Sequence, residues 1–265
     1  DVVLFFGGLN KASHQDCEDS DRYHLELPYA QDKVIEALAE ANPNLAVVIV
    51  SGNAVAMPWV DKVNAIVEGW YSGSQMGHAI ADVIFGKVNP SGKLPFTFPV
   101  KLEDNGAHAL NAYDPQDLTV EYKEDIYVGY RWADKQQVKP LFAFGHGLSY
   151  TDFKISKGRV VKTADGSMEF VASVKNTGKC AGATVVQLYV SKEGDVEGPV
   201  KTLRGYRRVE VAAGKTAEVR IPMNEDTFLW WNPEAGRMTP MHGEYLLHYG
   251  ETSDDAGLKT FEFEY

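Results

Sequence analysis

The sequence predicts an α/β three-layer sandwich domain with a mostly parallel sheet, followed by an all-β sandwich of immunoglobulin-like architecture. Up to residue 86, apolar runs of strand length alternate with segments of helical period, which is typical of a parallel sheet covered by helices. From residue 151 onward the apolar period changes to two, with turn residues between the runs. The 265 residues, 44% of them hydrophobic, suffice for the cores of two domains.

The first half is predicted to alternate strands and helices. Residues 2–6 and 45–50 are continuous apolar runs, as expected for parallel strands buried on both faces. A helix is expected at 29–42, with an apolar face made of Val34, Ile35, Leu38 and Ala41. The remaining elements expected here are a short helix within 55–63, a strand at 65–70 and a helix at 75–85 that ends at Gly86.

The loop after the first strand, residues 7–28, is long and polar. Ligands of parallel sheets bind beyond the carboxyl ends of the strands, and this loop follows directly on such an end. Long loops in that place are more often functional than idle. The chain also opens inside an expected buried strand, so we expect it to be truncated at the start of this domain, as a fragment or a cleaved product.

Short β-strands account for the second half. They are expected at 153–161, 168–175, 184–191, 203–211, 217–222, 244–249 and 260–265. The segment before them is aromatic and punctuated by glycines, without a clear period. The predicted organisation is therefore an α/β domain at 1–120, a connector at 121–150 and a β-sandwich at 151–265.

Composition excludes several classes of partner. The formal net charge of -11 and the pI near 5.1 argue against a nucleic acid or an anionic membrane, which would require a basic patch. No apolar run is long enough to span a bilayer. Two cysteines, Cys17 and Cys180, are too few for a disulfide scaffold or a structural zinc site.

Acidic residues crowd in the loop after the first strand. Glu18, Asp19 and Asp21 lie within four positions, and Arg22 follows them. Glycoside hydrolysis requires two carboxyl groups, one of them a proton donor whose pKa is raised. A catalytic carboxyl group in this loop would meet half of that requirement. From the residues alone, a hydrated loop with local ion pairing is the favoured interpretation, and a catalytic carboxyl group is the alternative.

Two other groups of residues have simpler explanations. The set His14, Asp16, Cys17 and Glu18 matches no common metal-ligand spacing, so we expect a solvated polar loop rather than a metal site. The pair Trp230-Trp231 could stack a sugar. Tandem aromatic residues in a sandwich usually include one core residue, and we expect that of this pair.

Several segments together resemble family 3 glycoside hydrolases along nearly the whole chain. They are Glu18-Asp19-Ser20-Asp21-Arg22, residues 81–99, residues 124–131 and residues 144–151. Asn176-Thr177-Gly178 and residues 182–190 are similar to the fibronectin type III-like domain of many members. The matches occur in the same order and spacing as in that family. Residues 81–99 contain a helix end, a turn and a proline-bounded extended piece, so we expect them to be structural.

The resemblance implies a division of catalytic labour. In the family, a preceding (β/α)8 barrel supplies an aspartate nucleophile, and the α/β sandwich domain supplies a general acid/base glutamate. The Glu-x-x-Asp-Arg match assigns that role to Glu18, with Asp21 and Arg22 as expected supports of the loop. The nucleophile is not in this chain. No cofactor and no metal are implied.

The resemblance also implies an activity for the whole protein. We expect the C-terminal portion of a retaining exo-β-glycosidase, a β-glucosidase in particular, acting on oligosaccharides or aryl β-glycosides. The isolated chain should be inactive without a domain or chain that carries the barrel. A non-catalytic carbohydrate-binding or stabilising module is the alternative. A periplasmic or secreted location is expected rather than a cytoplasmic one.

Overall fold

The structure is a computed structural model that describes residues 1–114 and 119–265. The chain forms two compact units. The first, here called the α/β unit, comprises residues 1–87, 98–125 and 139–141. The second, here called the sandwich unit, comprises residues 88–97, 126–138 and 142–265. Both units are therefore assembled from segments that are separated in the sequence.

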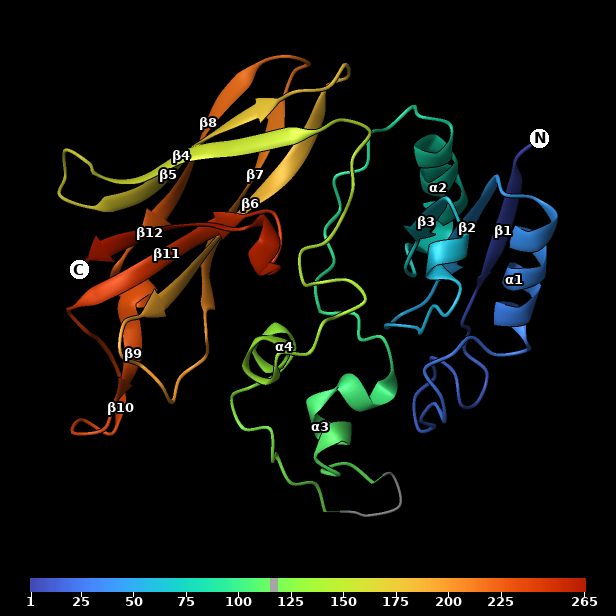
Figure 1. The fold of residues 1–265 in the computed structure, drawn as a ribbon, viewed down its shortest axis with the longest axis horizontal. Coiled ribbons are helices and arrows are strands. Elements are labelled where there is room, and N and C mark those ends of the chain that lie inside the picture. The colour runs from blue at the N-terminus through green and yellow to red at the C-terminus, as the bar shows by residue number, and fades with distance from the viewer. Residues whose placement is uncertain (115–118) are drawn as a thin grey trace. The chain divides into compact units, whose positions relative to one another are not determined.

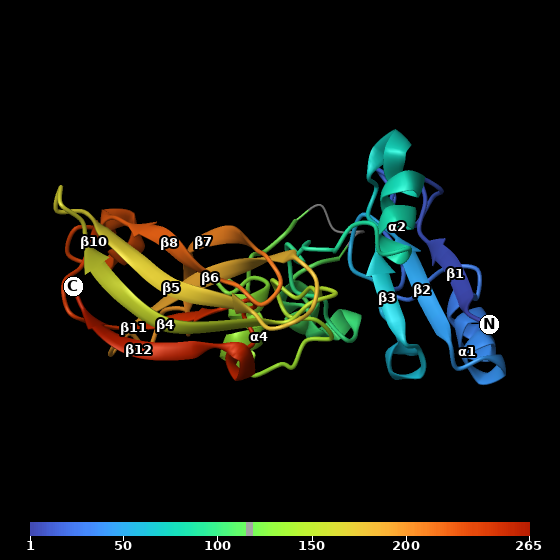
Figure 2. The ribbon, with the colours of Figure 1, turned by 90° about the horizontal axis from the view of Figure 1, so that it is seen from above.

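The α/β unit contains a parallel sheet of three strands in the order β1-β2-β3, as predicted. The strands lie side by side in Figures 1 and 2, with α1 beside β1. The expected helix within 55–63 is only a 3-10 turn at Val60–Lys62. The principal elements are β1 (Val3–Gly8), α1 (Gln31–Ala41), β2 (Leu45–Val50), β3 (Ala65–Glu68) and α2 (Met76–Ile84).

Burial in the sheet follows the prediction for β2 but not for β1. Leu45, Val47 and Ile49 of β2 are fully buried. In β1, Leu4 is 39% exposed and Phe6 is 58% exposed, so the expectation that this run is buried on both faces is wrong. The reason is position, since among the described residues β1 pairs with β2 alone and so lies at an edge of the sheet.

Helices α1 and α2 agree with their predicted positions. Ile35 of α1 is fully buried, whereas Val34, which was expected on the same face, is 47% exposed. Helix α2 ends as predicted, because Gly86 has a φ of 71°, a left-handed conformation that favours glycine. Two short helices in the following region were not predicted, α3 (Gly106–Ala109) and α4 (Tyr130–Gln136).

The sandwich unit has two antiparallel sheets, with strand orders β12-β11-β6-β7 and β4-β5-β8 (Figure 2). Each of the seven strands predicted from residue 153 onward is present within two residues at either end. Their inward side chains form one apolar core, from Ile155 to Tyr249. The strands are β4 (Phe153–Lys162), β5 (Met168–Asn176), β6 (Gly182–Lys192), β7 (Thr202–Val211), β8 (Thr216–Met223), β11 (Glu244–Gly250) and β12 (Lys259–Glu264).

A further hairpin, β9 (Leu229–Asn232) with β10 (Arg237–Pro240), was missed by the sequence prediction. Its strands are only four residues long, so two-residue periodicity has no room to appear. Trp230 is buried in the core and donates from Nε1 to Asp195 at 2.6 Å, while Trp231 is 59% exposed. The expectation that one tryptophan of the pair is a core residue is confirmed.

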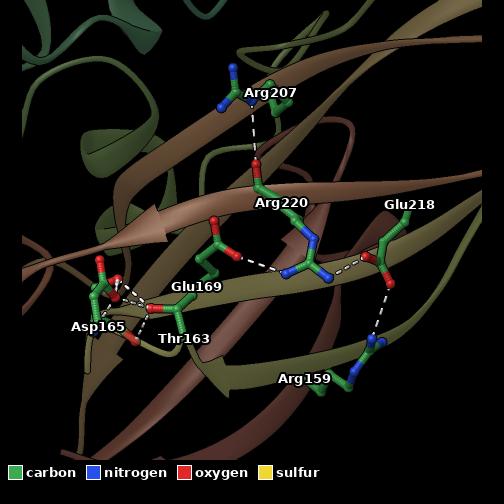
Figure 3. Close-up of polar contacts among 8 residues, drawn as sticks. Arg159, Thr163, Asp165, Glu169, Arg207, Glu218 and Arg220 are labelled. Atoms are coloured by element: carbon green, nitrogen blue, oxygen red, sulfur yellow. Dashed lines mark hydrogen bonds and ion pairs between the residues drawn. The ribbon is translucent and has the colours of Figure 1, made fainter.

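Charged side chains are paired across the outer face of the β4-β5-β8 sheet (Figure 3). Arg220 contacts Glu169 at 2.8 Å and Glu218 at 2.6 Å, and Glu218 also contacts Arg159 at 3.1 Å. Val171 lies in the row between the two arginines and is fully buried. The aliphatic stems of these side chains therefore cover an apolar residue on the outer face.

The segment at residues 88–97, part of the diagnostic run 81–99, belongs to the sandwich unit. The Asn89 amide donates to the carbonyl of Ala181 at 2.9 Å, and its Oδ1 accepts from Ser149 Oγ at 2.8 Å. A side chain at Gly147 would lie 2.1 Å from the carbonyl oxygen of Gly92, so the two backbones approach closely. This segment is structural, as expected, and it contacts two other parts of the sandwich unit, residues 147–149 and Ala181.

Candidate active site

The polar loops that follow β1, β2 and β3 meet at one edge of the sheet, because the strands are parallel. The expectation that the loop after the first strand lies at the carboxyl end of a parallel sheet is therefore confirmed. This edge carries Glu18 from the loop after β1, Gly52 from the loop after β2 and Tyr71 from the loop after β3. It is the place where ligands of such sheets bind.

Glu18 lies in a tight turn that is closed by a backbone bridge between Cys17 and Ser20. Asp19, the next residue in the turn, has a φ of 65°, which a short polar residue tolerates better than most. The Glu18 side chain is exposed. Within the described part of the chain it makes no hydrogen bond and no ion pair, so its carboxyl group is available to a ligand or another domain.

The start of the Glu18 loop is clamped to helix α1. Gln31 accepts from the amide of Gly8 at 2.8 Å and donates to the carbonyl of Gly8 at 2.9 Å. Buried Gln15 accepts from the amide of Asn10 at 3.1 Å and donates to Tyr29 Oη at 2.8 Å. These bonds satisfy backbone groups that a long loop would otherwise leave to water.

Arg22 holds the other side of the Glu18 turn. Its Nη1 donates to the carbonyl of Ala54 and its Nη2 to the carbonyl of Leu25, both at 2.8 Å. Burial lowers the pKa of Arg22, while the negative charge of Asp16 acts in the opposite direction. These two contacts are the kind that a loop support makes, since the planar guanidinium reaches two carbonyl groups at once.

Asp21 points to a different segment of the α/β unit. Tyr113 donates to Asp21 Oδ2 at 2.5 Å, and this hydrogen bond is the main reason why the pKa of Tyr113 is raised. Both side chains are on the surface. The contact ties the Glu18 loop to the residues after α3.

His14 is bonded to several residues around the Glu18 turn. Its Nδ1 lies 3.0 Å from both Ser20 Oγ and the carbonyl of Asp21, and its Nε2 lies 2.8 Å from Tyr23 Oη. The His14 and Tyr23 rings are stacked with centroids 4.0 Å apart. In the described residues, no group of three or more His, Cys, Asp or Glu side chains is placed to hold a metal ion.

Asp16, Tyr71 and Glu68 also line this edge. The sequence prediction named Asp16 only as part of a solvated polar loop, and it named neither Tyr71 nor Glu68. Asp16 Oδ2 accepts from the amide of Gly52 at 2.6 Å and from Tyr71 Oη at 2.9 Å. Glu68 ends β3 and accepts from the amide of Trp70 at 3.0 Å. The signal that could have found Glu68 and Tyr71 was their position at and just after the carboxyl end of the strand at 65–68.

The electrostatics of Glu68 depend mainly on burial. Burial raises the pKa of Glu68 to about 7, although hydrogen bonds from Trp70 and Ser51 act against the rise, and Asp16 adds to it. Ser51 is fully buried and lies 3.4 Å from both Glu68 carboxyl oxygens. Glu68 is thus a carboxyl group that changes charge near neutral pH.

A hollow of about 500 Å³ lies beside the Glu18 loop. Its lining combines apolar residues, such as Leu9, Leu27 and Pro28, with charged and aromatic ones, such as Arg22 and Tyr23. Mainly apolar walls with a few polar groups are typical of pockets that bind small molecules.

The chain matches known protein families in both of its parts. Residues 1–150 match the sequence profile of the Glycosyl hydrolase family 3 C-terminal domain. The chain belongs to glycosyl hydrolase family 3. Residues 184–253 match the Fibronectin type III-like domain, which accounts for the sandwich. The family expected from the sequence motifs is therefore confirmed.

Relatives of this family 3 chain carry the names of β-glucosidases. Beta-glucosidase BoGH3A of Bacteroides ovatus is 46% identical over 99% of the chain, which covers 36% of that protein. Thermostable beta-glucosidase B of Acetivibrio thermocellus is 42% identical over 98% of the chain, which covers 34% of that protein. The chain thus spans about a third of the length of the curated relatives it matches.

Solved structures of family 3 enzymes have the same fold. DesR, a β-glucosidase from Streptomyces venezuelae solved with D-glucose, has a TM-score of 0.91 and 37% identity, over 99% of this chain and 33% of that one. The Kluyveromyces marxianus β-glucosidase solved with glucose has a TM-score of 0.90 and 38% identity, over 100% and 31%. Both α/β and fibronectin-like parts are therefore shared with these enzymes.

Proposed function

We propose that the chain is the C-terminal portion of a retaining exo-β-glucosidase that releases terminal β-D-glucosyl residues. The relatives named above support the activity, and they are about three times as long as the chain. One observation carries the proposal for this chain's own role. The glutamate of the Glu-x-x-Asp-Arg pattern, Glu18, lies exposed in a turn at the carboxyl edge of the sheet, with anchored residues on both sides.

In the proposed mechanism Glu18 acts as general acid/base. It protonates the glycosidic oxygen while an aspartate of the (β/α)8 barrel attacks the anomeric carbon and forms a glycosyl-enzyme. Glu18, now a carboxylate, then removes a proton from the water that hydrolyses this intermediate. Retention requires the two carboxyl groups to lie about 5 Å apart in the assembled site.

The proposal makes the barrel an obligatory partner. The substrate would be an oligosaccharide or an aryl β-glycoside, and the isolated chain would be inactive because it lacks the nucleophile. Asp21 and Arg22 would support the loop, Arg22 through Ala54 and Leu25 and Asp21 through Tyr113. No step of this chemistry calls for a cofactor.

A mutation of Glu18 in the full-length enzyme tests the proposal. Glu18→Ala should lower turnover of cellobiose by about 10²- to 10⁴-fold, because the poor leaving group needs its proton. An activated dinitrophenyl β-glucoside should still form the glycosyl-enzyme, and azide should restore its turnover by attacking the intermediate. Glu262→Ala, at an exposed position of β12, is the matched control, and it should leave the turnover of both substrates unchanged.

Unchanged turnover of cellobiose by Glu18→Ala would contradict the proposal. The non-catalytic alternative would then gain support, and calorimetry of the chain with glucose and cellobiose would test it directly. No helix in the described residues is long and apolar enough to cross a membrane. The periplasmic or secreted location is part of the proposal, and fractionation of cells expressing the full-length protein would test it.

A further inference from the structure

One carboxylate connects all three loops at the carboxyl edge of the sheet. Asp16 belongs to the loop after β1, two residues before Glu18. Its Oδ2 accepts from the Gly52 amide in the loop after β2 at 2.6 Å and from Tyr71 Oη in the loop after β3 at 2.9 Å. The Glu18 turn is therefore tied to both neighbouring loops through a single oxygen atom.

The surrounding backbone is shaped for this contact. A Cβ atom at Gly52 would lie 3.0 Å from Tyr71 Cε2 and 3.3 Å from Asp16 Oδ2, so a side chain there would press on both partners. The backbone of Asp16 is also fixed, because its amide donates to the carbonyl of Asn10 at 3.0 Å. The backbone of Asp16 is thus held by its own loop, and its side chain is held by the loops after β2 and β3.

The environment of Tyr71 keeps it a hydrogen-bond donor to Asp16. Burial raises the pKa of Tyr71 to about 12, and the hydrogen bond to Asp16 adds to the rise, so Tyr71 keeps its proton and remains a donor at neutral pH. The two hydrogen bonds to Asp16 therefore come from two fixed donors, the backbone amide of Gly52 and the hydroxyl group of Tyr71.

We propose that Asp16 is a positioning residue that places the Glu18 carboxyl group through its bonds to Gly52 and Tyr71. This inference rests on the proposed role of Glu18. Three residues of the loop therefore have separate tasks: Glu18 transfers the proton, Arg22 secures the exit of the turn, and Asp16 secures its entry. A general acid must lie within hydrogen-bond reach of the glycosidic oxygen, so a displaced turn weakens protonation before it weakens sugar binding.

The test measures how the rate depends on the leaving group in the full-length enzyme. In Asp16→Ala and Tyr71→Phe, kcat/KM, which reports the glycosylation step, is measured for aryl β-glucosides whose phenols cover a range of pKa. Asp16→Ala should lose about 10- to 100-fold on the least acidic phenol and little on the most acidic one, so the Brønsted slope steepens. Tyr71→Phe should act in the same direction by a few-fold, because it removes one of the two donors.

Two residues of the same unit, half-buried Asp82 and exposed Tyr122, give matched controls. Asp82→Ala removes an aspartate whose partner is Lys87 on the surface, and Tyr122→Phe removes the hydroxyl of a tyrosine that is 81% exposed. Neither should change the slope. Tyr71→Phe keeps the test valid if Asp16→Ala fails to fold, since it removes a single oxygen atom.

The outcomes separate this inference from the proposed function. If Asp16→Ala and Tyr71→Phe lower kcat/KM equally for every phenol, or not at all, Asp16 does not position the acid and the inference is overturned. Glu18→Ala is measured alongside. A steeper slope in Glu18→Ala without one in the Asp16 and Tyr71 variants rejects the positioning role alone. An unchanged slope in Glu18→Ala rejects the proposed function and, with it, this inference.

Discussion

Carboxylates occupy two regions of this chain in opposite ways. On the outer face of the β4-β5-β8 sheet, Glu169 and Glu218 each have an arginine partner within 2.8 Å, and Figure 3 shows the chain of contacts they form. At the carboxyl edge of the β1-β2-β3 sheet, Glu18 is exposed and has no partner among residues 1–114 and 119–265. Its neighbours Asp16 and Arg22 make the bonds instead.

The difference indicates how surface charge and site charge can be distinguished. The carboxyl groups of Glu169 and Glu218 lie over the buried Val171, and both are engaged by arginines. Glu18 is exposed to water and, among the residues that the structure describes, unpaired, while the loop that carries it is held by several hydrogen bonds. A side chain held in place in this way, with its carboxyl group free, is the arrangement that a catalytic residue needs.

The largest expected effect is a loss of activity that occurs when Glu18 is changed but not when a paired carboxylate of the sandwich is changed. In the full-length enzyme, Glu18→Gln should lower kcat/KM for cellobiose by about 10²- to 10⁴-fold, because an amide cannot donate the required proton. Glu169→Gln, the same change in the paired region, should leave kcat/KM unchanged. Steady-state kinetics on the purified variants gives both values. Equal effects of the two substitutions would remove the distinction.

The next effect concerns a charge that is buried in the sandwich unit. Lys201 is 1% exposed and contacts Asp134 at 2.8 Å and Asp255 at 2.7 Å. Lys201→Ala should lower the free energy of unfolding by about 3 to 5 kcal/mol, because Asp134 is left buried without its cation. Thermal unfolding measures the loss. The double variant Lys201→Met with Asp134→Asn should recover part of it, and no recovery would contradict the pairing.

A smaller effect depends on pH and on Glu68. Its pKa in the folded protein is about 7, above the ordinary value of 4.5, so the folded state binds more protons between these values. The free energy of unfolding should therefore fall as pH rises from about 4.5 to about 7, by at most about 3 kcal/mol from this group.

Glu68→Gln should remove this contribution, so the variant should gain stability relative to the native sequence as pH rises to 8. Urea unfolding at pH 5 and pH 8 provides the comparison. Glu103→Gln, at an exposed position of the same unit, should retain the native pH dependence. The same dependence in both variants would exclude Glu68 as its source.

The smallest expected effect tests Arg22 as a support of the Glu18 loop. A lysine at this position cannot reach the carbonyl groups of Ala54 and Leu25 together, so Arg22→Lys should cost about 1 kcal/mol locally. Hydrogen exchange of the Glu18 loop should become faster and kcat/KM should fall a few-fold. Activity equal to that of the native enzyme would show that the support role is wrong.

Much of the fold could be predicted because its period is repeated over many residues. The strand at 45–50 was predicted with its exact bounds, and the seven long strands of the sandwich followed from their alternation. The exposure of Leu4 and Phe6 could not be predicted, since an apolar run does not reveal which strand is at an edge. Helix α4 was missed because seven residues carry too little of a helical period.

The candidate site was only partly visible in the sequence. The position of the Glu18 loop followed from the alternation of strands and helices, whereas the expected role of Glu18 came from the family resemblance. Asp16 and Tyr71 are 55 residues apart in the chain, so only the parallel sheet brings them together. Long-range side-chain contacts of this kind have no periodic signal along the sequence.

The interleaving of the two units has a consequence for synthesis. Residues 88–97 leave the ribosome well before residues 142–265, with which they form the sandwich unit. The side chain of Asn89 can therefore form its hydrogen bonds only after Ser149 and Ala181 have been synthesised. The sandwich cannot be completed until the last strands have emerged, and no single cut in the gene releases either unit whole. Exchange of the fibronectin-like part between family members would have to carry the earlier segment with it.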